Sequence, residues 1–128
     1  MLVYTHDYDS DYNPAMPVVE IQLRRSANRP AIHLQAIVDT GSDATMIPLP
    51  YLHQLQARKG HRQILSGTAG GRYEVDLYSV SVQIGNYRPV YVDAAGTVYR
   101  DEVIIGRDVL NQFVVTLNAP AYVVEVIE

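Results

Sequence analysis

The sequence has no cysteine and no tryptophan, and phenylalanine occurs only once. Without cysteine the chain forms neither disulfide bonds nor thiolate-ligated metal sites, so a reducing compartment is compatible with it. No uninterrupted apolar run approaches the ~18 residues that span a bilayer. The first residues also lack the basic and apolar regions of a secretory signal. These absences make the cytoplasm the simplest location, and no membrane partner is expected.

Positive charge is also scarce. Ten Lys and Arg residues stand against 14 Asp and Glu residues, which gives a formal net charge of −4. A nucleic-acid partner held through its phosphates is therefore not expected. The 128 residues are enough for one domain with a core and too few for two.

Patterns for metal binding are weak. The four histidines have no metal-ligand spacing. The segment DYDSDYN, residues 7–13, alternates acids as a calcium loop does, but Tyr12 and Val18 occupy the positions that need a glycine and an acid. We therefore interpret residues 1–16, which are acidic and rich in tyrosine, as a solvated and loosely held N-terminal arm. No metal and no cofactor are expected.

From residue 17 onward the sequence is typical of short strands separated by turns. Strand-like alternation or short apolar runs occur at residues 18–24, 31–38, 45–49, 72–85, 86–94, 102–105, 114–118 and 122–128. Short helices are predicted only after Pro50 and after Gly106. This pattern predicts one closed or sandwiched all-β domain over residues 17–128.

The stretch AIVDTGSDAT, residues 36–45, ends an apolar strand on a carboxylate. A charged carboxylate in a dry site is costly unless it is paired or hydrogen-bonded. Two carboxylates held side by side instead share one proton, so that one acts as general base and the other as general acid. Such a pair activates water for attack on a peptide carbonyl. The alternative is an ordinary turn aspartate, since Asp-x-Gly is common in turns and a bare Asp-Thr-Gly arises by chance in about a few per cent of chains this long.

Two further motifs follow in the chain. SGTAGG, residues 66–71, lies between strand-like flanks, and VIIGRDVL occupies residues 103–110. With the Asp-Thr-Gly motif, and in this order, they resemble the retropepsin-type aspartic proteases over roughly residues 18–127. The resemblance implies a closed β-barrel acid protease fold with one short C-terminal helix, active as a two-fold homodimer.

The resemblance assigns a role to each residue that matches the first motif. Asp39 is implied to be catalytic, the Thr40 hydroxyl to lock two active-site loops together, and the Gly41 backbone to face the substrate. Ser42 follows the tripeptide. Its hydroxyl is expected to donate to the outer oxygen of the carboxylate, which would favour the ionised form.

The other two motifs are implied to support this site. Asp43 and Arg107 would form a salt bridge beneath it, the alternative being two solvated charges of little energetic value. Ile104, Ile105 and Gly106 would open the C-terminal helix. The glycine hairpin would be a flap that binds substrate, although an ordinary hairpin turn is the alternative. The flap residues are Gly67, Thr68, Ala69, Gly70, Gly71 and Tyr73.

The sequence contains one Asp-Thr-Gly and no second Asp-Thr-Gly or Asp-Ser-Gly. A carboxylate pair therefore requires a second chain, related by a two-fold axis that brings Asp39 to its copy. The segment AYVVEVIE, residues 121–128, is a candidate for an intermolecular sheet, which the N-terminal arm could join. Its alternative is an ordinary edge strand within one domain.

We therefore predict a homodimeric aspartic endopeptidase that acts on polypeptides. One alternative is a catalytically weak or inactive retropepsin-like module that dimerises and binds peptides. Another is a structural domain in which Asp39 is only a turn residue. Peptide cleavage that survives Asp39→Asn would eliminate Asp39 as the catalyst.

Overall fold

A computed structural model gives the structure of the chain and describes residues 2–66 and 71–128. One sheet contains β2 (Val18–Arg24), β3 (Ile32–Val38), β4 (Met46–Pro48), β5 (Arg58–Ser66), β6 (Arg72–Ile84), β7 (Val90–Thr97) and β8 (Val103–Ile105). A second sheet contains β1 (Tyr4–Asp7), β9 (Val114–Asn118) and β10 (Val123–Ile127). The short helices are α1 (Leu49–Gln54), α2 (Arg107–Leu110) and the 3-10 turn η1 (Ala119–Ala121).

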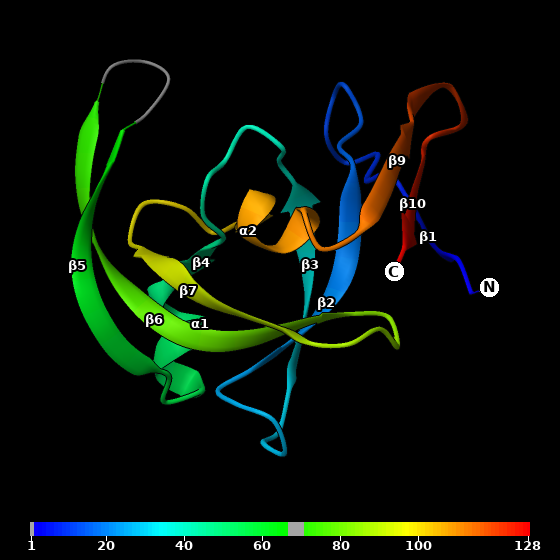
Figure 1. Cartoon of the computed structure of the whole chain (residues 1–128). Coiled ribbons are helices and arrows are strands. Elements are labelled where there is room, and N and C mark those ends of the chain that lie inside the picture. The colour runs from blue at the N-terminus through cyan, green and yellow to red at the C-terminus, as the bar shows by residue number, and fades with distance from the viewer. Residues whose placement is uncertain (1, 67–70) are drawn as a thin grey trace.

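The larger sheet closes on itself. Its strand order is β2-β3-β8-β4-β7-β6-β5, and β2 also pairs with β6, so six strands form a barrel and β5 lies outside the closure. Closure leaves these strands no free edge. Figure 1 shows β5 and β6 extending from the barrel as a long hairpin, with the smaller sheet at the opposite side. The predicted all-β barrel is confirmed.

Branched aliphatic side chains fill the barrel. In β2, the buried Ile21 and Leu23 alternate with the exposed Glu20 and the half-buried Gln22, which is the period of a strand with one face inside. Each fully buried aliphatic side chain contributes about 1.5–3 kcal/mol relative to an exposed one. The largest such side chains include Ile21, Leu23, Ile47, Leu52, Ile84 and Ile105. No helix of the described residues is both long and apolar enough to cross a membrane.

The N-terminal segment is part of the folded domain. β1 pairs antiparallel with β10, from Tyr4 opposite Val126 to Asp7 opposite Val123. The prediction of a loosely held arm is therefore wrong for this part of the chain. The acidic composition suggested solvation, but the strand's backbone hydrogen bonds and the partly buried Tyr4 provide the attachment.

Tyrosine hydroxyls fasten this segment at both ends. The Tyr87 hydroxyl lies 2.6 Å from the carbonyl oxygen of Leu2 and 2.8 Å from that of Val126. The Tyr12 hydroxyl donates a hydrogen bond to the Glu102 carboxylate, and this bond raises the pKa of Tyr12 to about 12. Tyrosine hydroxyls on both the arm and the barrel thus form hydrogen bonds that phenylalanine could not form.

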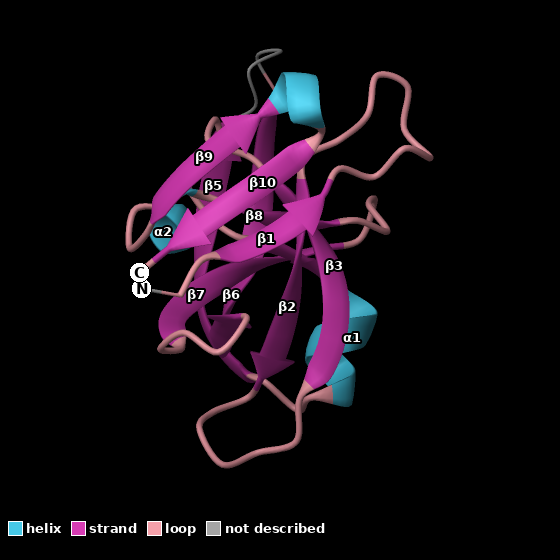
Figure 2. Cartoon of the chain, turned by 90° about the vertical axis from the view of Figure 1, so that its right-hand side faces the viewer, coloured by secondary structure: helices cyan, strands magenta, loops and turns pink. Residues whose placement is uncertain are grey.

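β10 is the central strand of the smaller sheet, with β1 on one side and β9 on the other. Neither edge of β10 is therefore open to a second chain, and residues 121–128 do not form the edge strand that was the alternative. The open edges of this sheet belong to β1 and β9. Figure 2 shows the sheet face-on, with the two chain termini close together at one side of it.

Candidate active site

Asp39 lies where two parallel strands end. β3 and β8 pair in parallel, with Val38 opposite Ile105, and the Asp39 N–H donates to the Ile105 carbonyl at 3.0 Å. The carboxyl ends of both strands consequently reach the same edge of the barrel. This pairing brings the loop at residues 39–45 beside the start of α2 at residues 106–108, although the two are far apart in the sequence.

The Asp39 carboxylate is half-buried and held by its own loop. The Gly41 N–H donates to Oδ1 of Asp39 at 2.9 Å, and the Ser42 N–H donates to the Asp39 carbonyl at 3.2 Å. Within the described residues no other hydrogen bond reaches the carboxylate. Its remaining acceptor positions are therefore available to water, to substrate or to a second carboxyl group.

The Ser42 hydroxyl does not bind the carboxylate. It donates to the Ala44 carbonyl at 2.7 Å, and a hydroxyl has only one proton to donate. The expected hydrogen bond from Ser42 to Asp39 is therefore replaced by one that tightens the turn of the loop. Ser42 supports the site through backbone geometry rather than through the charge of Asp39.

Arg107 joins α2 to the loop through three contacts. It forms an ion pair with Asp43, as the resemblance implies, and its Nη1 donates to the Thr40 carbonyl at 2.7 Å. Its backbone N–H donates to the Ser42 carbonyl at 2.9 Å. The Asp43 side chain is 83% exposed, so the ion pair itself adds less than about 1 kcal/mol. The bonds from Arg107 to loop carbonyls give it a positioning role.

A second link between the loop and α2 was not predicted. Oδ2 of Asp108 accepts from the Thr45 N–H at 2.9 Å, and Oδ1 accepts from the Thr45 hydroxyl at 2.8 Å and from the Val109 N–H at 2.9 Å. Thr45 is fully buried and its hydroxyl also accepts from the Gly106 N–H at 3.3 Å. No local pattern marks this link, because its partners are distant in sequence.

We expect Asp108→Ala to lower the free energy of unfolding by about 2–4 kcal/mol, because the buried N–H and hydroxyl of Thr45 lose their acceptor. Asp108→Asn keeps one oxygen and one polar nitrogen, so it should cost less than half as much. Urea unfolding at equal protein concentration measures both. Equal losses for the two variants would show that the hydrogen bonds to Thr45 are not the source of the stabilisation.

Gly106 lies where the start of α2 touches the loop. A Cβ atom at this position would be 2.7 Å from the carbonyl carbon of Ala44 and 2.8 Å from the carbonyl oxygen of Ser42. The preceding Ile104 and Ile105 are the last two residues of β8, and both are buried. In the motif at residues 104–107, the two isoleucines pack in the core, Gly106 has no room for a side chain, and Arg107 binds the loop.

A sequence profile described as retroviral aspartyl protease matches residues 12–118 of the 128. The chain belongs to this family. No significant match is found among curated proteins.

Two solved structures have the same fold. EIAV protease complexed with the inhibitor HBY-793 is 19% identical with a TM-score of 0.56, over 76% of this chain and 86% of that chain. A retropepsin-like aspartic protease from Rickettsia conorii is 12% identical with a TM-score of 0.64, over 98% of this chain and 91% of that chain. At these identities the likeness concerns the fold alone.

The residues predicted to form a flap lie in and around the turn of the β5–β6 hairpin, which extends from the barrel (Figure 1). Its strands pair up to Ser66 opposite Arg72, and the half-buried Gly71 precedes β6. The predicted tip residues Gly67, Thr68, Ala69 and Gly70 lie outside the described residues, as does the side chain of Tyr73.

A cleft lies between this hairpin and the loop at residues 39–45. Asp43 and Ala44 of the loop and Asp108 of α2 contribute to its lining. Gln63 and Leu65 of β5 and Leu77 of β6 line it from the hairpin. Asp39 itself is not among the residues that line the cleft; the lining includes Asp43 and Ala44 of the same loop. No group of three His, Asp or Glu side chains suited to a metal ion occurs among the described residues.

Proposed function

We propose that the chain is an aspartic endopeptidase that works as a homodimer. The Asp39 carboxylates of two chains lie together at the two-fold axis and share one proton. The ionised carboxylate takes a proton from water as the water oxygen attacks the peptide carbonyl carbon, and the protonated one donates to the carbonyl oxygen. A proton then passes to the departing amine as the C–N bond breaks. The substrate is a polypeptide, bound in extended form beneath the β5–β6 hairpin.

The observation that carries this proposal is the hydrogen bonding of Asp39. The loop supplies the carboxylate with one backbone donor, the Gly41 N–H, and leaves its other acceptor positions free. The neighbouring Thr40 is exposed, and within the described residues its hydroxyl makes no hydrogen bond. A carboxylate and a hydroxyl left open side by side are suited to meeting their copies across a two-fold axis.

Activity that depends on dimers predicts a particular concentration dependence. The rate of peptide cleavage per chain is expected to fall on dilution, in proportion to the fraction of chains that remain dimeric. Initial rates on a peptide library between about pH 4 and 7 would be compared with sedimentation velocity at the same protein concentrations.

Two results would count against the proposal. A constant rate per chain in solutions that sediment as monomers would show that one chain acts alone. A dimer that cleaves nothing at any pH would favour the alternative function, a peptide-binding module that has the retropepsin fold but no hydrolytic activity.

A further inference from the structure

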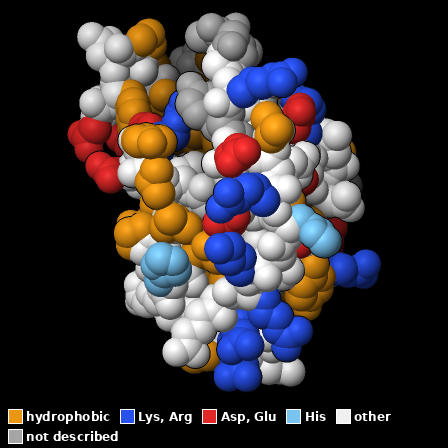
Figure 3. Space-filling view, turned by 90° about the vertical axis from the view of Figure 1, so that its left-hand side faces the viewer, with side chains coloured by type: hydrophobic (Ala, Val, Ile, Leu, Met, Phe, Trp, Pro, Cys, Tyr) orange, Lys and Arg blue, Asp and Glu red, His pale blue; other side chains and the backbone are white. Residues whose placement is uncertain are grey.

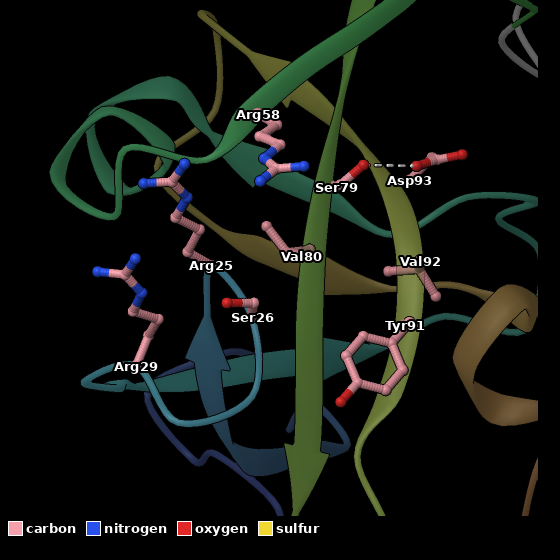
Figure 4. A pocket seen from close by; sticks show the side chains of 9 residues that line it. All are labelled: Arg25, Ser26, Arg29, Arg58, Ser79, Val80, Tyr91, Val92 and Asp93. Carbon is pink, nitrogen blue, oxygen red and sulfur yellow. Dashed lines mark hydrogen bonds between the residues drawn. The ribbon is translucent and has the colours of Figure 1, made fainter.

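A second hollow, of about 400 Å³, lies on the outer surface of the barrel away from Asp39. Arg25 and Arg29 of the turn between β2 and β3 line it together with Arg58 at the start of β5. In the view of Figure 4, the three guanidinium groups lie on one side of β6, and Tyr91 and Asp93 of β7 lie on the other. Three cations from two separate parts of the chain thus border one concave site.

Among the described residues, these arginines differ from the nearby Lys59 and Arg62 in having no ion-pair or hydrogen-bond partner. Lys59 and Arg62 both pair with Asp76, and their hydrogen bonds hold the pKa of Asp76 below its usual value. Within residues 2–66 and 71–128, the side chains of Arg25, Arg29 and Arg58 make neither an ion pair nor a hydrogen bond. The three guanidinium groups are therefore free to bind an anion.

The hollow has a net positive charge in a protein whose formal net charge is −4. Asp93 is the one acid in its lining, and its Oδ1 already accepts from the Ser79 hydroxyl at 3.2 Å. In the view of Figure 3, Lys and Arg side chains gather at the lower end, whereas Asp and Glu side chains lie among those of the middle and upper parts. A concave site lined by charges of one sign strengthens the local electrostatic field and attracts ions of the opposite charge. A guanidinium group binds a carboxylate through two parallel hydrogen bonds.

The strand register connects this hollow to the cleft that Asp43 and Ala44 line. Arg58, Ser79 and Asp93 are direct cross-strand neighbours and so share one face of β5, β6 and β7. Leu77, two residues before Ser79, lies on the same face of β6 and lines the cleft. Two residues of a strand span about 7 Å. The two sites also share a wall, formed by residues 91–93.

We propose that the arginine hollow binds acidic residues of the polypeptide substrate, a few positions away from the bond that is cleaved. This proposal rests on the proposed endopeptidase function for its substrate, since an extended chain in the cleft continues along β6 and β7 into the hollow. Its carboxylates would then meet Arg58, Arg25 and Arg29. The site would select substrates that carry an acidic segment and would act through binding rather than through the chemical step.

Binding can be tested separately from cleavage. A fluorescein-labelled tetraglutamate peptide and its tetraglutamine counterpart are titrated with the full-length Asp39→Asn protein, and anisotropy is recorded. Tetraglutamate is expected to bind at least about tenfold more tightly. Arg58→Ala should weaken its binding about threefold or more, and the triple change Arg25→Ala, Arg29→Ala, Arg58→Ala should abolish the preference. Arg88→Ala removes one charge from an exposed turn outside the hollow and should leave the affinity unchanged.

Cleavage assays then test the link to the active site. Fusing tetraglutamate to a cleaved peptide should lower KM and leave kcat unchanged, and the triple variant should lose this difference. Equal binding of the two probes, or equal effects of Arg58→Ala and Arg88→Ala, would overturn the proposal. Displacement of tetraglutamate by inorganic phosphate would also overturn it, if the phosphate concentration needed is below the dissociation constant of tetraglutamate. That result would indicate a site for small anions. Tetraglutamate binding without any peptidase activity would refute the endopeptidase function and leave the acidic site standing.

Discussion

Replacing Asp39 by asparagine is expected to lower kcat/KM for peptide cleavage at least about 1000-fold, because an amide neither accepts nor returns the proton that general acid–base catalysis requires. The fold should persist. The asparagine oxygen still accepts from the Gly41 N–H, and the backbone bonds to Ile105 and Ser42 do not involve the side chain. Progress curves from about pH 4 to 7 and thermal unfolding of the same samples measure the two effects.

A matched control makes the same chemical change elsewhere. Asp7→Asn converts an exposed aspartate of β1, outside the site, and should retain the wild-type rate. An Asp39→Asn protein that unfolds at a much lower temperature would leave the loss of activity open to a structural cause. A stable Asp39→Asn protein that still cleaves would eliminate Asp39 as the catalyst.

Mixing the two proteins extends the test to the second carboxylate. If both copies of Asp39 are needed, only dimers with two wild-type chains cleave, and equal amounts of the two proteins form about one quarter of such dimers at exchange equilibrium. Total activity should then fall to about a quarter of that given by the same concentration of wild-type dimers. A fall to one half would mean that each chain works independently of the residue opposite it.

The larger sheet could be predicted from sequence because its signals are local. β2 lies between Pro17 and a polar turn, and its alternation gives the same bounds, Val18–Arg24, in the sequence and in the structure. The long strand at residues 72–85 was also predicted from its alternation. In the structure β6 ends at Ile84, and Gly85, with φ of +54°, begins the turn. Alternation identifies such strands without any knowledge of their partners.

Two strands of the smaller sheet were predicted, at residues 114–118 and 122–128, but β1 was not, because its pairing joins the two ends of the chain. Nothing local in residues 4–7 indicates that they pair with residues 123–127, and their acidic neighbours favoured a solvated arm. In the candidate site, too, some features could be predicted from the sequence and others could not. The resemblance indicated Asp39, Asp43 and Arg107, whereas the buried link between Thr45 and Asp108 depends on two side chains that are distant in sequence.

Gly106→Ala is expected to be among the most damaging single-methyl changes in the chain. The backbone at Gly106 is extended, with φ of −93° and ψ of −174°, a conformation that alanine adopts without strain. The cost is therefore steric, since the new methyl group would lie 2.7 Å from the carbonyl carbon of Ala44. That atom belongs to the backbone, so the whole loop must shift. Overpacking of this kind costs at least about 2 kcal/mol.

The same shift should lower activity beyond the loss of stability. Displacing the loop at residues 42–44 by about 1 Å misplaces Asp39, and errors of that size cost on the order of 100-fold in rate. Gly60→Ala is the matched control, because its methyl group would meet only the Leu77 carbonyl oxygen at 3.6 Å, an ordinary contact. Urea unfolding and kcat/KM are compared at equal protein concentration. If both alanine variants behave alike, close packing at Gly106 does not hold the catalytic loop in place.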